Sequence, residues 1–354
     1  HLGYEKHSNQ GDHSGNSRNG SYRKQIQTEM GKSVIQVPRD REGEFEPIVV
    51  PKHQSRGLSI ERLVISLYAK GMSVADIESE MQEIYGINLS TSAISIITNK
   101  VSQAATEWQN RPLDSLYMIV WMDGIVFKVR ENGKVINKTV YLCVGLNKEG
   151  LKEVLGMWIG KNESAAFWMG VLTDLKARGV EDILITVTDN LNGFTETIKS
   201  VFPASTTQIC VVHQIRNSCR YVVWKEKKEF TADLKNIYNA PTKEAAEMEL
   251  DNFEQKWGAK YPYAIRSWRN NWEELTVFFD FPVEIRKIIY TTNLIENLNG
   301  KIRKYTKNKL SFPNDDALKK SVYLAINEIE KKWYQPIWNW ALIFNQFITI
   351  FENR

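Results

Sequence analysis

The sequence has 354 residues, of which 42% are hydrophobic and 25% charged, and its formal net charge is only +4. This composition is typical of a soluble globular protein and excludes a fibrous or wholly disordered chain, while the length favours two or three domains. No apolar run reaches the roughly 18–20 residues of a membrane-spanning helix, so we expect no membrane partner. Three cysteines are too few for a disulfide framework and indicate a reducing, intracellular setting.

Residues 1–56 are predicted to form an extended arm. Turn-forming residues dominate its first part, and Pro38, Pro47 and Pro51 favour extended backbone. Because the sequence begins with His1 rather than methionine, we also expect native chain upstream of it.

Residues 57–111 have apolar residues at helical spacing, which predicts three short helices. Gly71 would end the first helix, Ser73 would cap the second, and Ser90 or Thr91 would cap the third. Two interpretations fit this pattern. One is a helix-turn-helix-like DNA-binding unit whose last helix enters a major groove, and the other is a small helical linker bundle.

Residues 112–213 alternate between strand and helix patterns. Strands are predicted at 117–129, 135–146, 153–159, 183–188 and 208–212, with helices at 164–177 and 194–202. This order predicts a mixed sheet flanked by helices, an α/β core. Residues 214–290 have helical periodicity only, and 291–354 are predicted to be helices that complete the core.

Three acids are candidates for chemistry because of their positions. Asp123 interrupts an apolar run, where a buried carboxylate is costly unless it has a partner. Asp189 follows a short buried strand, at the edge where ligands gather in α/β sheets. Glu296 lies on a predicted helix that leads into a basic stretch. Singly, each acid could be structural; together they predict a carboxylate site for a hard divalent cation such as Mg²⁺.

A spaced motif around the second acid resembles a known family. It reads Asp189-x-x-x-Gly193-Phe194, then six residues, then Val201-Phe202-Pro203-Ala204-Ser205-x-x-Gln208-x-Cys210-x-x-His213. This pattern closely resembles the signature of mutator-family transposases from bacterial insertion sequences, and the resemblance extends from the Arg39–Pro47 segment to the C-terminus. Asn190 stands where many relatives have glycine, which alters the turn and leaves the acid in place.

The resemblance implies a DDE transposase with an RNase H-like catalytic core, interrupted by an all-α insertion domain at residues 214–290. It implies that Asp123, Asp189 and Glu296 are the three catalytic and metal-binding acids. They would hold two Mg²⁺ ions, replaceable by Mn²⁺, for cleavage of transposon ends and 3′-OH strand transfer. The expected partners are double-stranded DNA (terminal inverted repeats and target DNA) and a second copy of the chain on paired ends, in the bacterial cytoplasm near the nucleoid.

Several residues are candidates for DNA contact. The resemblance places the Cys210-x-x-His213 element near the active site, where it would help to position the DNA end. With Cys219 it could instead ligate zinc, but a fourth ligand is not evident. Arg216 opens a basic stretch in which Trp224 could stack on an unpaired base.

A second basic stretch follows Glu296 and contains Lys301, Arg303, Lys304 and Lys307. These side chains could neutralise phosphates beside the scissile bond, and the alternative is a merely solvated face. Two rival functions also remain. One is a nuclease or resolvase of the same fold that hydrolyses without strand transfer, and the other is a catalytically inactive, domesticated DNA-binding protein.

Overall fold

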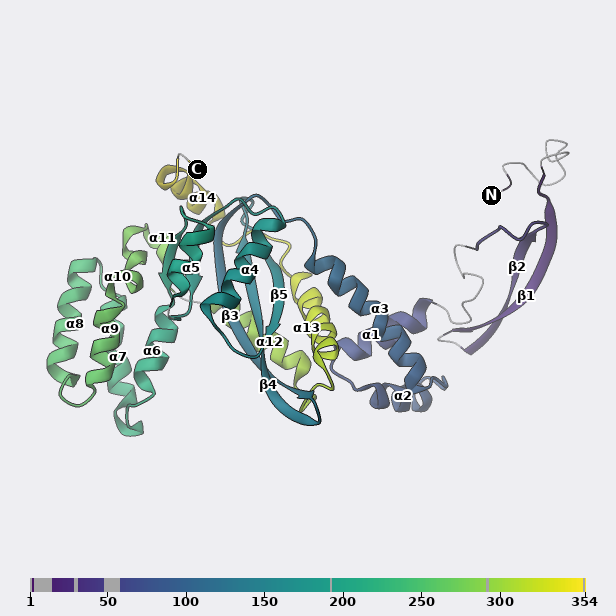
Figure 1. Ribbon diagram of the computed structural model, residues 1–354, viewed down its shortest axis with the longest axis horizontal. Coiled ribbons are helices and arrows are strands. Elements are labelled where there is room, and N and C mark those ends of the chain that lie inside the picture. The colour runs from purple at the N-terminus through teal and green to yellow at the C-terminus, as the bar shows by residue number, and fades with distance from the viewer. Residues whose placement is uncertain are drawn as a thin grey trace. The chain divides into compact units, whose positions relative to one another are not determined.

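A five-stranded mixed sheet forms the centre of the larger of two compact units in this computed structural model (Figure 1). The structure describes residues 2, 15–28, 31–47, 58–191, 193–290, 293–352 and 354. One unit contains the described residues up to 103 together with 305–309, and the other contains 104–304 and 310–354. No described helix is both long and apolar enough to cross a membrane.

The described part of the predicted arm is a two-stranded antiparallel sheet, which the sequence analysis did not anticipate. Strands β1 (Arg18–Thr28) and β2 (Gly31–Asp40) pair with Tyr22 opposite Val37. Ile26 and Val37 are buried, so this segment does have apolar surface to cover. Pairing also satisfies the backbone donors and acceptors that face the partner strand, which an unpaired extended arm would leave to water. Residues 15–17 and 41–47 beside the strands are described but form no strand or helix, and most of the remaining arm lies outside the described residues.

The three helices predicted for residues 57–111 are confirmed as α1 (Leu58–Ala69), α2 (Val74–Glu83) and α3 (Thr91–Gln109). Ser73 and Asp76 form a reciprocal capping box at the start of α2. Ser90 Oγ accepts a hydrogen bond from the amide of Ala93 at the start of α3, so Ser90 has the predicted capping role.

The sheet has the strand order β5-β4-β3-β6-β7. Its strands are β3 (Leu116–Glu131), β4 (Lys134–Leu146), β5 (Lys152–Gly160), β6 (Asp182–Thr188) and β7 (Thr206–Ile209). The first three strands form an antiparallel meander, and β6 and β7 run parallel to β3. The predicted mixed sheet is therefore confirmed.

The last strand is shorter than predicted. Residues 208–212 were expected to be extended, but β7 ends at Ile209 and α6 (Val211–Cys219) begins two residues later, with Cys210 as its N-cap residue. The apolar residues from Ile209 to Val212 run on from strand into helix. A short apolar run of this kind carries no periodicity that could separate the two structures.

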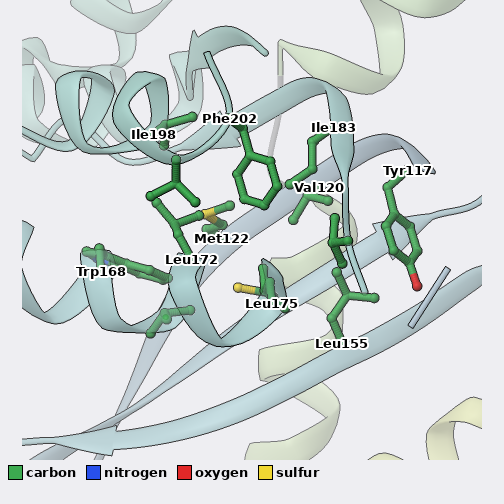
Figure 2. Packing of buried hydrophobic residues seen from close by; sticks show 14 of the residues in the cluster. Tyr117, Val120, Met122, Leu155, Trp168, Leu172, Leu175, Ile183, Ile198 and Phe202 are labelled. Carbon is green, nitrogen blue, oxygen red and sulfur yellow. The ribbon is translucent and has the colours of Figure 1, made fainter. Parts of the chain in front are cut away.

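Helices α4 (Ala165–Ala177) and α5 (Phe194–Val201) cover one face of the sheet. Figure 2 shows their apolar side chains, such as Trp168 and Ile198, packed over Val120 and Met122 of β3. Because neighbouring side chains on a strand point to opposite faces, Asp123 lies on the other face of the sheet from Met122.

A helical segment follows β7, as predicted for residues 214–290. It comprises α6, the 3₁₀ turn η2 (Trp224–Glu226), α7 (Lys227–Tyr238), α8 (Lys243–Trp257), α9 (Pro262–Asn270), α10 (Trp272–Leu275), η3 (Val277–Asp280) and α11 (Val283–Ile289). The helical periodicity corresponds to buried apolar stripes, from Ala246 to Trp257 on α8 and from Ile265 to Leu275 on α9 and α10. The chain ends with α12 (Asn293–Thr306), α13 (Asp315–Glu330) and α14 (Trp340–Ile350).

Candidate active site

Four elements bring the candidate acids together. Asp123 lies within β3, and Asp189 follows the end of β6, which is the neighbouring parallel strand. His213 lies in the first turn of α6. Glu296 lies in the first turn of α12, where the helix dipole favours a negative side chain.

Backbone hydrogen bonds fix the start of α6 to the segments that carry two of the acids. The amide of Cys210 donates to the carbonyl of Thr188 at 2.8 Å, directly before Asp189. The amide of Val211 donates to the carbonyl of Tyr290 at 3.2 Å, shortly before α12 begins. The imidazole of His213 is thereby held between the end of β6 and the start of α12.

The imidazole contacts two acids. Its Nδ1 lies 2.5 Å from Asp189 Oδ1, and its Nε2 lies 3.7 Å from Glu296 Oε1. One ligand atom each from Asp123, Asp189 and His213 lie within 4.8 Å of one another. The predicted acids therefore converge, and His213 stands among them.

Arg216 lies one helical turn after His213 and binds the third acid. Its Nη1 and Nη2 donate to the two carboxylate oxygens of Glu296 at 2.6 and 2.8 Å. This two-pronged geometry is the strong form of an arginine–carboxylate pair. Arg216, which the sequence analysis assigned to DNA, thus has an acid of the site as its partner in this structure.

Asp123 is held by neutral donors rather than by a cation. The side chain is buried, with Oδ1 accepting from the amide of Gly124 at 2.7 Å and Oδ2 accepting from Asn299 Nδ2 at 2.6 Å. Asn299 was not identified from the sequence. It lies three residues after Glu296, and residues three apart share a helix face, so that spacing was the signal available.

Crowding of negative charge perturbs the site. Burial raises the pKa of Asp123 to about 7, the charge of Asp189 adds to this, and His213 opposes it. For His213, burial lowers the pKa, but hydrogen bonds to Asp189 and Cys210 outweigh burial and hold the pKa above its usual value. Burial and the charge of Asp189 also raise the pKa of Glu163, whose carboxylate accepts a hydrogen bond from the indole of Trp168.

The donor set suits a divalent metal ion. Asp189 Oδ1 is buried, and its close neighbour is Nδ1 of the His213 ring. Carboxylate oxygens are the ligands that hard cations such as Mg²⁺ and Mn²⁺ prefer. Cys219 is not a member of the group of candidate ligands found among the described residues, so the structure gives no support to the alternative of a zinc site with Cys219.

The model of the family described as "Transposase, Mutator family" matches residues 1–336. The chain belongs to the Mutator family of transposases. It is 43% identical over 340 residues (96% of this chain and 85% of the relative) to a probable transposase for an ISRM3-like insertion sequence element of Sinorhizobium fredii. Identity and coverage are the same for the transposase of insertion sequence element ISRM3 of Rhizobium meliloti.

A less similar relative is also named as a transposase. The chain is 34% identical over 336 residues (95% of this chain and 85% of the relative) to the transposase of element IS905 of Lactococcus lactis. A simian T-cell lymphotropic virus intasome in complex with a PP2A regulatory subunit matches 56% of this chain and 67% of that chain, at 15% identity and a TM-score of 0.21. A TM-score this low supports no conclusion about the chain.

The remaining candidate residues of this transposase lie at the start of α6, on η2, and on or just after α12. Cys210 is fully buried, and Trp224 on η2 is 86% exposed. The four candidate basic residues after Glu296 are exposed; Lys301, Arg303 and Lys304 lie on α12, and Lys307 follows it. With 3.6 residues per turn, Arg303 lies on the same face of α12 as Glu296, two turns further along.

Proposed function

We propose that this transposase is of the DDE type, with Asp123, Asp189 and Glu296 as its catalytic and metal-binding residues. The observation that carries the proposal is their convergence around His213, although they lie 66 and 107 positions apart in the sequence. A merely structural acid would need one cation or donor nearby and would gain nothing from two further acids, which repel it.

The fold we assign to the catalytic core is RNase H-like. Its support is the antiparallel meander β3-β4-β5 followed by the parallel strands β6 and β7, which gives the order β5-β4-β3-β6-β7. In this assignment α6 to α11 form an all-α insertion domain between β7 and α12. The three helices α1 to α3 serve as a helix-turn-helix-like DNA-binding unit.

Two Mg²⁺ ions, replaceable by Mn²⁺, are the cofactors that we assign to the three acids. When bound, such ions supply stabilisation of the charge on the scissile phosphate and of the departing oxygen. The chain's own residues orient this site. Asn299 fixes the carboxylate of Asp123, and His213 and Arg216 hold Asp189 and Glu296 in place.

The reaction consists of two displacements at phosphorus. Water attacks a phosphodiester at the transposon end, the P–O3′ bond breaks, and the 3′ oxygen takes a proton to become a hydroxyl group. That hydroxyl then attacks a phosphodiester of target DNA, forming a new P–O3′ bond while the former 3′ oxygen leaves. No covalent protein intermediate is needed. The substrates are double-stranded terminal repeats and target DNA, held by two copies of the chain, in the bacterial cytoplasm at the nucleoid.

DNA contacts are assigned to two sets of residues. His213, Arg216 and Trp224 would position the DNA end at the start of the insertion, and Cys210, which is fully buried, would act only by fixing the start of α6. Lys301, Arg303, Lys304 and Lys307 would neutralise phosphates flanking the scissile bond, since phosphate contacts fix register without reading sequence. The exposure of the four basic side chains supports the second assignment.

Neutral variants of the acids test the proposal. Asp123→Asn, Asp189→Asn and Glu296→Gln should each abolish metal-dependent cleavage and strand transfer while end binding in gel shifts remains largely intact, because each removes a metal ligand. Glu181→Gln, at an exposed acid beside β6, is the matched control and should keep full activity. An acid variant with normal strand transfer would remove that residue from the site.

A substrate that needs no cleavage distinguishes strand transfer from the two rival functions. An oligonucleotide end that already carries a 3′-OH should be joined to plasmid DNA by the wild-type chain. Cleavage without joining would identify a nuclease or resolvase, and binding without metal-dependent cleavage would identify an inactive DNA-binding protein.

A further inference from the structure

A groove opens in the helical segment, away from the acids. It lies between the C-terminal end of α6 and the beginning of α9, and it encloses a cavity of about 970 Å³. Its lining includes Arg220, Tyr221, Lys260 and Tyr263, and no carboxylate is among the described residues that line it. None of the candidate residues assigned to DNA above belongs to this lining.

Two tyrosines line the groove, and their rings are exposed to solvent. Tyr221 is 71% and Tyr263 is 70% exposed, and the ring centroids lie 6.4 Å apart with a 41° angle between the planes. Arg266 holds its guanidinium carbon 5.7 Å from the ring centre of Tyr263. Aromatic rings usually bury most of their surface, so two adjacent exposed rings beside arginines indicate a surface for a planar ligand.

The charge of the groove fits a nucleic-acid backbone. Arg220 and Lys260 line it, and Lys225 and Lys228, which follow Arg220 in the sequence, are exposed. Glu226, the acid within this basic stretch, is engaged by Lys260 and by the hydroxyl of Tyr261. Because Lys260 is paired with Glu226, the positive charge left for a phosphate comes from Arg220, which lines the groove, and from the exposed lysines that follow it in the sequence.

The floor of the groove is fixed by buried side chains. Ser218 Oγ accepts a hydrogen bond from the indole of Trp268 at 2.9 Å and donates to the carbonyl of Gln214 at 2.8 Å. The side-chain amide of Gln214 in turn donates to Ser267 Oγ at 2.8 Å. Trp268 and Gln214 are fully or almost fully buried. A floor held in this way is formed before any ligand arrives, which lowers the cost of binding.

Helix α6 connects this groove with the site of the acids. His213 lies in its first turn, and Tyr221 follows eight residues later, just beyond its end. Eight helical residues span about 12 Å, and this corresponds to about three or four nucleotides along one strand of B-form DNA. DNA held at the acids therefore has nearby nucleotides within reach of the tyrosines.

We propose that this groove captures an unpaired nucleotide of the DNA beside the scissile phosphate, with its base stacked on Tyr221 and Tyr263 and its phosphate on Arg220. The proposal rests on the proposed function, because it takes the DNA to be bound at the acids. It assigns the stacking role to the tyrosine pair rather than to Trp224, which does not line the groove. Stacking accepts any base, so the groove would add affinity without reading sequence.

The test compares two forms of one transposon-end DNA, bound to the full chain in Ca²⁺ and followed by fluorescence anisotropy. One form carries three unpaired nucleotides next to the scissile phosphate, and the other carries abasic sites at the same positions with every phosphate kept. The wild-type chain should prefer the form with bases by about tenfold, since each base stacked on an aromatic ring is worth a factor of this order.

Substitutions then locate the preference. Tyr221→Ala/Tyr263→Ala should bind both forms equally and keep wild-type affinity for the abasic form, whereas Tyr221→Phe/Tyr263→Phe should keep the preference because its rings remain. Tyr334→Ala is the matched control at a tyrosine that is 74% exposed elsewhere, and it should behave as wild type. Circular dichroism melting of each variant verifies folding, and the Phe pair keeps the test informative if the Ala pair does not fold.

Three results would overturn this inference while leaving the proposed function intact. These are a preference that survives in the Tyr→Ala pair, a preference lost only in Trp224→Ala, and no preference in the wild type despite normal duplex binding. Failure to bind any DNA would instead count against the proposed function itself.

Discussion

The carboxylates of this transposase are supported in two different ways. Asp189 and Glu296 each have a cationic or protonatable partner on α6, namely His213 and Arg216. The described hydrogen bonds to Asp123 come from the amide of Gly124 and the side chain of Asn299, and burial raises its pKa to about 7. Ionised Asp123 is therefore the acid that depends most on Asn299 and on any metal ion for stabilisation.

Asn299→Ala should weaken the site through Asp123. Loss of the 2.6 Å hydrogen bond frees the carboxylate to rotate. Since groups that orient metal ligands typically contribute about tenfold to a hundredfold in activity or metal affinity, we expect cleavage to slow by this factor and to require more Mg²⁺. Initial rates across a Mg²⁺ titration measure both effects. Asn297→Ala, at an exposed position on the same helix, should leave the rate and the Mg²⁺ requirement unchanged. If Asn299→Ala gave the same Mg²⁺ titration curve as the wild type, the orienting role would be refuted.

At the scale of elements, α12 carries both a candidate catalytic acid and a group of basic residues. Glu296 and Asn299 lie in its first half, and exposed basic residues occupy its second half. A helix with negative charge at its start and positive charge at its end is also favoured by its own dipole. The element therefore combines a local folding preference with a surface suited to phosphates.

Replacing Arg303, Lys304 and Lys307 with glutamine should lower affinity for specific and random duplexes alike. Each phosphate contact contributes about one to the slope of the logarithm of the binding constant against the logarithm of salt concentration. The magnitude of this slope should therefore decrease by up to about three. Gel shifts over a salt series measure this, and saturating DNA should restore cleavage. The control replaces Lys148, Lys331 and Lys332, which are also exposed and give the same change in net charge. Loss confined to one end sequence would make this stretch a base reader.

Gly71→Ala should destabilise the turn between α1 and α2. Gly71 has φ +95°, and a Cβ there would collide with the carbonyl oxygen of Tyr305. Gly86 has φ +61° with open space around it, so Gly86→Ala isolates the cost of the left-handed backbone, about 1–2 kcal/mol. Gly71→Ala should cost about 1–3 kcal/mol more. Urea unfolding of both variants gives the difference in their free energies of unfolding. Equal losses of stability would show that the backbone at Tyr305 shifts to accommodate the added methyl group.

At the scale of the whole molecule, neither compact unit is continuous in the sequence. Residues 305–309 complete the unit formed by the first part of the chain, where the Lys309 ammonium lies 3.9 Å from the ring centre of Tyr68. The α3 and α12 helices each run from one unit into the other. The five-segment division expected from the sequence stays a prediction, since segments need not correspond to bodies that fold separately.

Paired transposon ends should bind two copies of the chain. Each chain provides one described group of candidate metal ligands, whereas two ends must be cleaved and joined. Mass photometry of a complex containing two end duplexes should therefore give a protein mass twice that of the 40.9 kDa chain. Single end duplexes added below the concentration for pairing serve as the control. A stable complex of one chain with two active ends would contradict this expectation.

The sequence by itself determined the family, the order of strands and helices in the core, and which acids to examine. These follow from local information: apolar periodicity specified β3 to β6 and α1 to α5, and the motif from Asp189 to His213 identified the relatives. Where the pattern was ambiguous, prediction failed. The apolar residues that end β7 continue into α6, so the boundary between the two was misplaced. The arm had too few apolar residues to indicate the pairing of β1 with β2.

Only the tertiary structure decided which polar side chains contact one another. The contacts of His213 with Asp189 and Glu296, of Arg216 with Glu296 and of Asn299 with Asp123 join residues up to 176 positions apart. The groove at Tyr221 and Tyr263 likewise needs two helices to meet. Periodicity reports which face of an element is apolar, but it carries no information on which polar side chains will face one another after the elements pack. That choice is made by the three-dimensional arrangement of β3, β6, α6 and α12.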